Sequence, residues 1–498
     1  MQRIAHLISG ESASNPDARV SPVFNPATGE QSAELELAST TTVEEAIKKA
    51  DAAFGDWSAR TPINRARIMF RYKQLLEDNK EELAVMVSRE HGKTIDDAKG
   101  SITRGIEIVE FACGIPQMMK GEYSANVGTG VDSFNTRQAL GVCAGITPFN
   151  FPAMVPLWMF PVALACGNTF VLKPSEKTPS CPLRMVELAH EAGVPKDVLS
   201  VVNGDKEAVD AILHDPRVKA VSFVGSTPIA EYIYQTGTAQ NKRVQALGGA
   251  KNHMIVMPDA DVSRVTDALI GSAFGSAGER CMAISVAVCV GDETANQVRD
   301  AVSAAARKLN VGPYTDENSD FGPLSNEAHM NKVMSYIDKG VEEGADLIVD
   351  GRDLKLQGYE GGYYVGPCVF DNVTDDMTIY KEEIFGPVLG IVRSESYADA
   401  LDLVNEHELG NGAALFTNDG GVARHFVEQT KIGMVGVNVP IPVPVAYHSF
   451  GGWKRSLFGD HHMHGPEGIR FYTKMKTATV AWPGGKNTGP EFSIPTLS

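Results

Sequence analysis

The sequence has few cysteines, and they form no short paired motif. Seven occur in 498 residues, and no two have C-x-x-C spacing. An odd number without such spacing argues against a disulfide framework and suits a reducing compartment. Apolar runs long enough to cross a bilayer are also missing, as are a secretory signal and an Arg/Ser-rich transit segment. These absences predict a cytoplasmic protein without a membrane partner.

Positive charge is scarce relative to negative charge. Lysine and arginine total 45 against 62 acidic residues, which gives a formal net charge of −17. This balance argues against nucleic acid and anionic membranes as main partners, although it is compatible with a local basic pocket for an anionic substrate. The apolar content of 43% is typical of a soluble globular enzyme, and the length predicts two or three domains.

Strand and helix patterns alternate from residue 141 onward. Before that point, helical periodicity prevails from Thr41 to about residue 113, and Thr41 with Glu44 suggests a capping box at its start. Residues 120–140 are polar and are predicted to be strands outside the main core. The later alternation predicts parallel sheets with crossover helices, whose ligands bind at the carboxyl ends of strands. Three predicted strand ends carry polar residues: 147–150, 173–176 and 225–227.

The third strand end has features of a phosphate site. Ser226 follows a predicted strand and opens a predicted helix, where free N–H groups could hold a pyrophosphate. Lys173 could reach a ribose or phosphate, and Glu176 could accept a hydrogen bond from a ribose 2′-hydroxyl, which favours NAD over NADP. The alternative is that each is ordinary loop chemistry that ends a strand.

A cysteine among small residues is the strongest candidate for covalent chemistry. Cys281 follows the charged pair Glu279 and Arg280. A positive neighbour lowers the pKa of a thiol, and the thiolate is a strong nucleophile. We expect Gly275 and Gly278 to let the backbone approach the group that the sulfur attacks. A buried core cysteine beside a surface ion pair is the alternative interpretation.

Two other features have simpler interpretations. Arg104 lies on a predicted amphipathic helix, where a solvated face or a helix ion pair would explain it. Three histidines at 461, 462 and 464 could suggest a metal, but adjacent histidines point in diverging directions and no partner cluster is evident. We therefore predict no metal site.

Six stretches, in this order, resemble the aldehyde dehydrogenase superfamily: residues 147–152 (TPFNFP), 173–176 (KPSE), 223–227 (FVGST), 247–249 (LGG), Cys281 and 383–387 (EIFGP). The resemblance implies an α/β fold with a Rossmann-type parallel-sheet NAD domain, an α/β catalytic domain and a small β element for oligomerisation. It implies that Cys281 is the nucleophile, with the Asn150 amide and the Cys281 N–H as oxyanion donors. It further implies a set of cofactor-binding residues: Thr147, Phe149, Lys173, Glu176, Lys177, Ser226, Gly248, Glu383 and Phe385.

The same resemblance suggests domain boundaries and an assembly. Residues 1–118 and 140–249 would form the NAD-binding domain, and residues 250–448 the catalytic domain. Residues 119–139 and 470–498 would form the oligomerisation element. The family implies either a dimer or a dimer of dimers, and we expect the homotetramer.

One departure narrows the expected reaction. Ordinary members carry a glutamate directly before the LGG stretch as general base for thioester hydrolysis, and this sequence has Ala246. A missing base removes a contribution of roughly 10²–10⁴-fold, whereas a thiolate acceptor needs less help. Three longer strings, 278–282 (GERCM), 440–444 (PIPVP) and 450–460 (FGGWKRSLFGD), resemble the CoA-acylating, methylmalonate-semialdehyde branch of the family. The cofactor would be NAD, and coenzyme A would be the second substrate.

That branch implies oxidative decarboxylation of malonate and methylmalonate semialdehydes to acetyl-CoA and propionyl-CoA. Arg104 and Arg280 are then candidates for holding the substrate carboxylate, because a guanidinium fork matches its geometry. The preferred semialdehyde and the pathway, such as valine or inositol breakdown, stay open. A hydrolytic enzyme that uses another base, such as Glu279, is the main rival, and a catalytically silent protein on this fold is a second.

Overall fold

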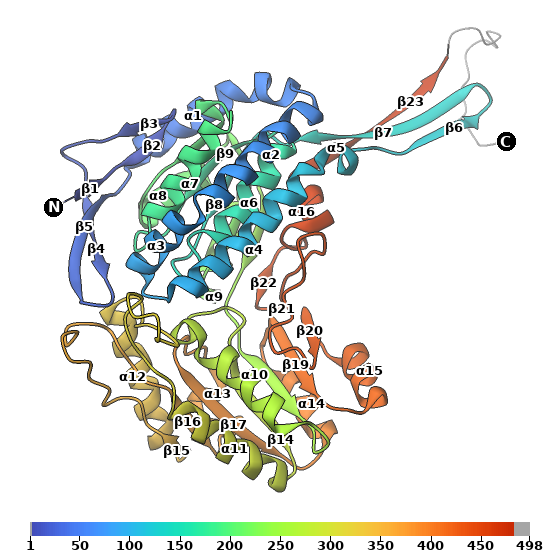
Figure 1. Cartoon of the computed structure of the whole chain (residues 1–498). Helices are drawn as coiled ribbons and strands as arrows, with labels where there is room; N and C mark the ends of the chain where they lie inside the picture. The colour runs from blue at the N-terminus through green and yellow to red at the C-terminus, as the bar shows by residue number, and fades with distance from the viewer. Residues whose placement is uncertain (1, 483–498) are drawn as a thin grey trace.

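The computed structural model describes residues 2–482, and two large sheets dominate it (Figure 1). The first has eight strands in the order β22, β12, β11, β8, β9, β10, β2 and β3. These span Leu457–Phe458, Arg243–Leu247, Val218–Val224, Val142–Ile146, Thr169–Lys173, Leu199–Val201, His6–Ile8 and Glu11–Ala13. The strands from β12 to β10 are parallel, with antiparallel strands at both edges. The predicted parallel sheet is confirmed.

The second sheet has seven strands in the order β15, β16, β17, β14, β13, β19 and β20. These span Asp346–Val349, Cys368–Asp371, Val388–Ser394, Ile284–Val290, Asn252–Val256, Gly412–Phe416 and Met434–Val437. All neighbours are parallel except β15 and β16. A three-stranded sheet near the N-terminus orders β1, β5 and β4 (Gln2–Ile4, Glu30–Glu36 and Val20–Asn25), and β18 pairs with β21 (Leu409–Gly410 and Trp453–Lys454).

Helices α6 to α15 lie between the strands of the two large sheets, whereas α1 to α5 form one run between β5 and β6 (Tyr123–Gly128) and α16 precedes β23 (Thr473–Ala481). Those of the N-terminal half are α1 Thr40–Ala59, α2 Pro62–Asp78, α3 Lys80–His91, α4 Ile95–Cys113, α5 Ile115–Met118, α6 Met154–Ala165, α7 Ser180–Glu191, α8 Lys206–His214 and α9 Thr227–Ala239. Those of the C-terminal half are α10 Val262–Phe274, α11 Asp292–Ala306, α12 Glu327–Glu342, α13 Thr378–Lys381, α14 Tyr397–Glu406, α15 Gly420–Gln429 and α16 Gly465–Phe471. Within residues 2–482, no helix is both long and apolar enough to cross a bilayer.

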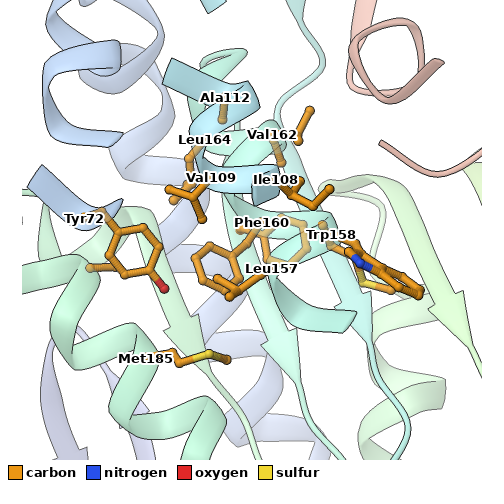
Figure 2. Close-up of a cluster of buried hydrophobic side chains, with 14 of the residues drawn as sticks. Tyr72, Ile108, Val109, Ala112, Leu157, Trp158, Phe160, Val162, Leu164 and Met185 are labelled. Carbon is orange, nitrogen blue, oxygen red and sulfur yellow. The ribbon is translucent and has the colours of Figure 1, made fainter. Parts of the chain in front are cut away.

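One helix lies at the centre of the first core. Helix α6 is apolar all round, and every residue of it except Met154 is buried, as expected for a helix covered on all sides. Figure 2 shows its side chains Leu157 and Phe160 among Tyr72 of α2 and Val109 of α4. Burial of each large apolar side chain contributes about 1.5–3 kcal/mol to folding. This core holds rigid the loop that leads from β8 into α6.

A long antiparallel arm projects away from the two sheets (Figure 1). Strand β23 (Thr473–Ala481) pairs with β7 (Val131–Ala139), and β7 pairs with β6 (Tyr123–Gly128). The strands that we predicted outside the main core for residues 120–140 are therefore confirmed. Helix α16 ends at Phe471, two residues before β23 begins. Residues 483–498 of the predicted oligomerisation element lie outside the described residues.

The first helix begins earlier than the sequence suggested. Its N-cap is Ser39, whose hydroxyl accepts a hydrogen bond from the Thr42 N–H at 3.3 Å, so the predicted capping box of Thr41 and Glu44 is wrong. The Glu44 position is already in the helix interior. A serine two residues upstream reaches the free N–H groups first, because capping needs a residue with extended backbone just outside the helix.

Candidate active site

The candidate residues gather where the two large sheets meet. Thr147, Lys173 and Ser226 lie at or just after the carboxyl ends of β8, β9 and β11. Cys281 lies before β14, at the amino end of a strand in the second sheet. A hydrogen bond spans the gap, because the Asn150 Nδ2 donates to the Glu279 carbonyl oxygen at 2.9 Å. The site therefore needs both sheets.

Cys281 lines a cavity of about 260 Å³. The other lining residues are Asp97, Gly100, Ser101, Arg104, Phe151, Met154, Trp158, Arg280, Met282, Ile441, Val443 and Phe450. Cys281 is partly exposed, whereas the other six cysteines are buried. This placement favours a reactive thiol over the alternative of a core cysteine.

The loop before Cys281 has a strained backbone. Ser276 and Ala277 have φ values of 57° and 52°, a region that side-chain-bearing residues seldom adopt. A Cβ on Gly278 would lie 2.1 Å from the Gly386 carbonyl oxygen, and one on Gly275 would lie 2.5 Å from the Arg280 guanidinium. The expectation for these glycines is therefore corrected. They admit another segment of the chain and the Arg280 side chain, and not the group that the sulfur attacks.

Three asparagine side chains hold the backbone around the thiol. Besides the Asn150 bond to Glu279, Asn252 Nδ2 donates to the carbonyl oxygens of Cys281 and Ala283, each at 2.9 Å. Asn411 Nδ2 donates to the Cys281 carbonyl oxygen at 3.1 Å. The sequence analysis did not identify Asn252 or Asn411, although Asn252 follows shortly after the LGG stretch.

The environment of Cys281 disfavours its thiolate in the free enzyme. Burial raises the pKa of the thiol to about 11, and the Glu383 carboxylate adds to this shift. The Cys281 N–H and the cations of Lys93 and Arg280 act in the opposite direction. The predicted lowering by the arginine exists but is outweighed, because desolvation penalises a charge strongly.

Both predicted arginines line the Cys281 cavity and already have protein partners. The Arg280 Nη2 lies 2.9 Å from Asp97 Oδ1, and Nη1 donates to the Gly271 carbonyl. Arg104 Nη1 lies 2.7 Å from Glu107, so the helix ion pair foreseen as an alternative is present. The Arg104 Nη2 also donates to the carbonyls of Val443 and Pro444, in the proline-rich stretch 440–444.

The predicted phosphate end of the site has a free helix terminus. Helix α9 begins at Thr227, and the side chain of its N-cap, Ser226, makes no capping hydrogen bond. Lys173 is buried, and its Nζ lies 3.5 Å from Glu176 Oε2. The hydroxyl of Thr147 is buried and has no hydrogen-bond partner among residues 2–482. Because buried polar groups are nearly always hydrogen-bonded, this hydroxyl is available to a ligand.

Aromatic rings and a carboxylate form the other end of the predicted cofactor site. Phe149 packs edge-on against Phe385 with 6.1 Å between ring centroids, and Lys177 Nζ lies 5.0 Å from the Phe149 centroid. Glu383 accepts a hydrogen bond from the Ala250 N–H at 3.0 Å. Burial raises the pKa of Glu383 to about 7.

The two glycines of the LGG stretch lie in close contact with other parts of the chain. A Cβ on Gly249 would lie 2.4 Å from Glu383 Oε2, and one on Gly248 would lie 2.9 Å from the Arg455 carbonyl. Only glycine fits at these two positions without displacing a neighbour. The fold thus brings Gly249 and Glu383 close together, from positions far apart in the sequence.

No titratable side chain stands at the position of the missing base. Ala246 is fully buried in an apolar cluster that includes Phe223. Glu279, the rival base, does not line the Cys281 cavity. Its Oε1 accepts hydrogen bonds from Ser325, and its Oε2 lies 3.4 Å from His91 Nε2. Burial raises the pKa of Glu279 to about 8 and lowers that of His91.

The three clustered histidines have separate surroundings. His461 Nδ1 lies 3.0 Å from Glu467, and His464 is buried against the rings of Trp158 and Phe450. Within residues 2–482, no group of three or more His, Cys, Asp or Glu side chains is arranged to hold a metal ion.

Comparison with known sequences covers almost the whole chain. The family model for aldehyde dehydrogenases matches residues 13–478. A malonate-semialdehyde dehydrogenase from Pseudomonas aeruginosa is 56% identical over 498 residues, which is all of both chains. Malonate-semialdehyde dehydrogenase 2 from Geobacillus kaustophilus is 48% identical over 484 residues, covering 97% of this chain and 99% of that protein.

Comparison with solved structures gives the same result. A methylmalonate-semialdehyde dehydrogenase from Oceanimonas doudoroffii superposes with a TM-score of 0.96 at 57% identity, covering 97% of this chain and 99% of its own. A structure from Sinorhizobium meliloti 1021, complexed with NAD, has a TM-score of 0.96 at 56% identity with the same coverage. The predicted fold is confirmed. The chain belongs to the aldehyde dehydrogenase family.

Proposed function

We propose that this protein is an NAD-dependent, CoA-acylating dehydrogenase of malonate and methylmalonate semialdehydes. One observation carries the proposal: Cys281, Arg104 and Arg280 line a single cavity, whereas the position of the usual hydrolytic base is Ala246. The names of the P. aeruginosa and O. doudoroffii relatives support this substrate class. The products are acetyl-CoA and propionyl-CoA, with release of CO₂.

The residues at the cleft fit a nicotinamide dinucleotide. The uncapped start of α9 at Ser226 suits a pyrophosphate, and Lys173 and Glu176 suit the adenosine ribose. The buried, unpaired Thr147 hydroxyl would gain a hydrogen-bond partner from a polar atom of the cofactor. The S. meliloti neighbour is complexed with NAD, which supports the choice. When bound, NAD would accept the hydride from the aldehyde carbon.

Cys281 would supply the nucleophile. Its sulfur adds to the aldehyde carbon, and the negative charge that develops on the aldehyde oxygen needs donors already in place. Asn150 uses one N–H for the Glu279 carbonyl, so its second N–H and the backbone N–H of Cys281 would stabilise that oxygen. Oxidation then leaves the substrate as a thioester on Cys281.

The arginines of the cavity would select substrates with a second, anionic end. Malonate semialdehyde carries a carboxylate that is separated from the aldehyde group by one methylene carbon. Arg280, next to the nucleophile, and Arg104, on α4, would bind it in place of some of their present partners. Charge-assisted, bidentate bonds of this type are the strongest that a carboxylate makes.

The acyl group would pass to a thiol, since the position of the usual hydrolytic base is an alanine. Ala246 has no base to offer, and the Glu279 carboxyl faces Ser325 and His91, away from the cavity. The thioester carries a β-carboxylate, so loss of CO₂ gives an enolate that the same oxyanion donors stabilise before it takes a proton. The thiolate of coenzyme A then attacks the thioester carbonyl and releases the Cys281 sulfur.

The proposal extends to the domains and the assembly. Residues 1–118 and 140–249 would bind NAD, and residues 250–448 would carry the nucleophile. The arm of residues 119–139 and 470–498 would hold subunits together, because its exposed edge and apolar residues such as Met475 offer a pairing surface. A homotetramer in the cytoplasm is the expected state.

NADH formation from both semialdehydes, with and without coenzyme A, tests the function directly. We expect a CoA-dependent steady state that yields acetyl-CoA or propionyl-CoA, and no more than a burst when coenzyme A is omitted. Free acid formed at the same steady rate without coenzyme A would refute acyl transfer. Malonyl-CoA or methylmalonyl-CoA as the released product would refute decarboxylation before transfer.

A further inference from the structure

Two buried asparagines converge on one carbonyl oxygen at the nucleophile. The Cys281 oxygen accepts hydrogen bonds from Asn252 Nδ2 at 2.9 Å and from Asn411 Nδ2 at 3.1 Å. Asn252 is 2% exposed and Asn411 is 8% exposed. A carbonyl oxygen has two lone pairs, so these two amides fill its capacity. Neither asparagine lines the cavity that contains the thiol.

The two asparagines are also joined to each other and to the second sheet. Asn252 opens β13, and its Oδ1 accepts a hydrogen bond from the Gly412 N–H at 2.9 Å. Gly412 opens β19 and directly follows Asn411. The second N–H of Asn252 reaches the Ala283 carbonyl, and Asn411 Nδ2 also lies 3.0 Å from Met282 Sδ. The side-chain N–H groups of both asparagines are thus directed at residues 281–283, the segment that carries the thiol.

We propose that Asn411, together with Asn252, is a positioning residue that sets the orientation of the Cys281 backbone for attack on the aldehyde. This inference rests on the proposed function. The backbone N–H of Cys281 is one of the two proposed oxyanion donors, and fixing the carbonyl of the same residue limits rotation about its Cα. The amides thereby hold both the sulfur and the donor in register with Asn150.

The strain of the preceding loop explains why such a clamp is needed. Ser276 and Ala277 lie in the left-handed region, so the loop by itself would favour other conformations. Asn411 supplies its donors from the bend between β18 and β19, outside the loop that it holds. An asparagine suits this task because one short, stiff side chain can donate two hydrogen bonds. A misplacement of about 1 Å at a reacting group costs roughly a hundredfold in rate.

The test compares two reactions of the same thiol in the Asn411→Leu enzyme. Leucine keeps the volume of the side chain and removes both donors. The rate of the first NADH turnover from malonate semialdehyde should fall about 10–100-fold with KM nearly unchanged. Alkylation of Cys281 by iodoacetamide, which needs no oxyanion donor, should change less than about threefold. Asn405→Leu is the matched control, since Asn405 also clamps a loop, at Gln429 and Lys431, away from the thiol.

Three results would overturn the positioning role. They are an unchanged first turnover, a rise in KM alone, and an equal loss of turnover and alkylation. If the leucine variant does not fold, Asn411→Ser replaces it, because its hydroxyl is too short to reach the Cys281 carbonyl directly. A wild-type enzyme that forms no NADH from either semialdehyde would instead refute the proposed function, and the positioning role with it.

Discussion

The Asp97 carboxylate lies 2.9 Å from the guanidinium of Arg280, the residue directly before Cys281. The same carboxylate lies 3.9 Å from the Nζ of Lys93, which is buried and makes no hydrogen bond among the described residues. Burial raises the pKa of Asp97, but these two cations outweigh it and hold the pKa at about 2. Asp97 is therefore ionised at every pH where the enzyme would work, and it neutralises part of the positive charge in the cavity.

Replacement of Asp97 by asparagine should destabilise the fold. Lys93 would be left as a buried cation without a counter-charge, which typically costs about 3–5 kcal/mol. Urea unfolding at pH 7 measures the loss. Asp96→Asn, on the exposed side of the same helical turn, is the control and should change the free energy of unfolding by less than about 0.5 kcal/mol. Equal stability of the two variants would contradict the role of the pair.

Replacement of Arg280 by glutamine should weaken the binding of carboxylated aldehydes and leave the binding of neutral aldehydes nearly unchanged. Loss of a charge-assisted bond of about 1.5–3 kcal/mol should raise KM for malonate semialdehyde roughly 10–100-fold. KM for propanal, which has no carboxylate, should change little. The exposed Arg264→Gln on α10 serves as control. If KM rose equally for both aldehydes, Arg280 would shape the loop and would not bind the substrate carboxylate.

Alkylation of the free enzyme should report the raised pKa of the thiol. With a pKa of about 11, the thiolate fraction of Cys281 grows about tenfold for each pH unit between 7.5 and 9.5. The iodoacetamide rate, followed by mass mapping of Cys281, should rise in the same proportion. Cys281→Ser gives the background from the six buried cysteines. A plateau below pH 8.5 would mean that nearby cations outweigh burial.

The loss of folding stability between pH 5 and 8 should depend on the protonation of Glu279. Its pKa is about 8 in the folded chain against an ordinary value of 4.5, so the folded state retains a proton that the unfolded state loses. The contribution of this proton is present below pH 4.5 and is lost as pH rises through about 8. Glu279→Gln should therefore lose less stability between pH 5 and 8 than the wild type.

Thermal unfolding across that pH range measures the effect. Glu395→Gln, at an exposed position, is the control and should follow the wild-type curve. Parallel curves for Glu279→Gln and the wild type would show that Glu279 is already ionised in the folded protein.

The amino-acid sequence by itself determined the local elements and supplied the residues of the proposed site. The alternation after residue 141 gave the parallel strands, because side-chain periodicity reflects burial within each element. The sequence placed Thr147 after a strand and Ser226 at the start of a helix, where the structure also has them. The expectation that no general base stands at Ala246 required only the identity of one residue next to a motif.

The tertiary structure alone decided which distant groups touch. Asn411 and Cys281 are 130 positions apart, and an asparagine between two glycines looks like an ordinary turn until the strands are assembled. Asp97 was an unremarked helix residue, and Gly278 proved to make room for Gly386. Periodicity records only whether a side chain is buried within its own element. The partner of a buried polar group is set by the packing of sheets and loops from remote parts of the chain.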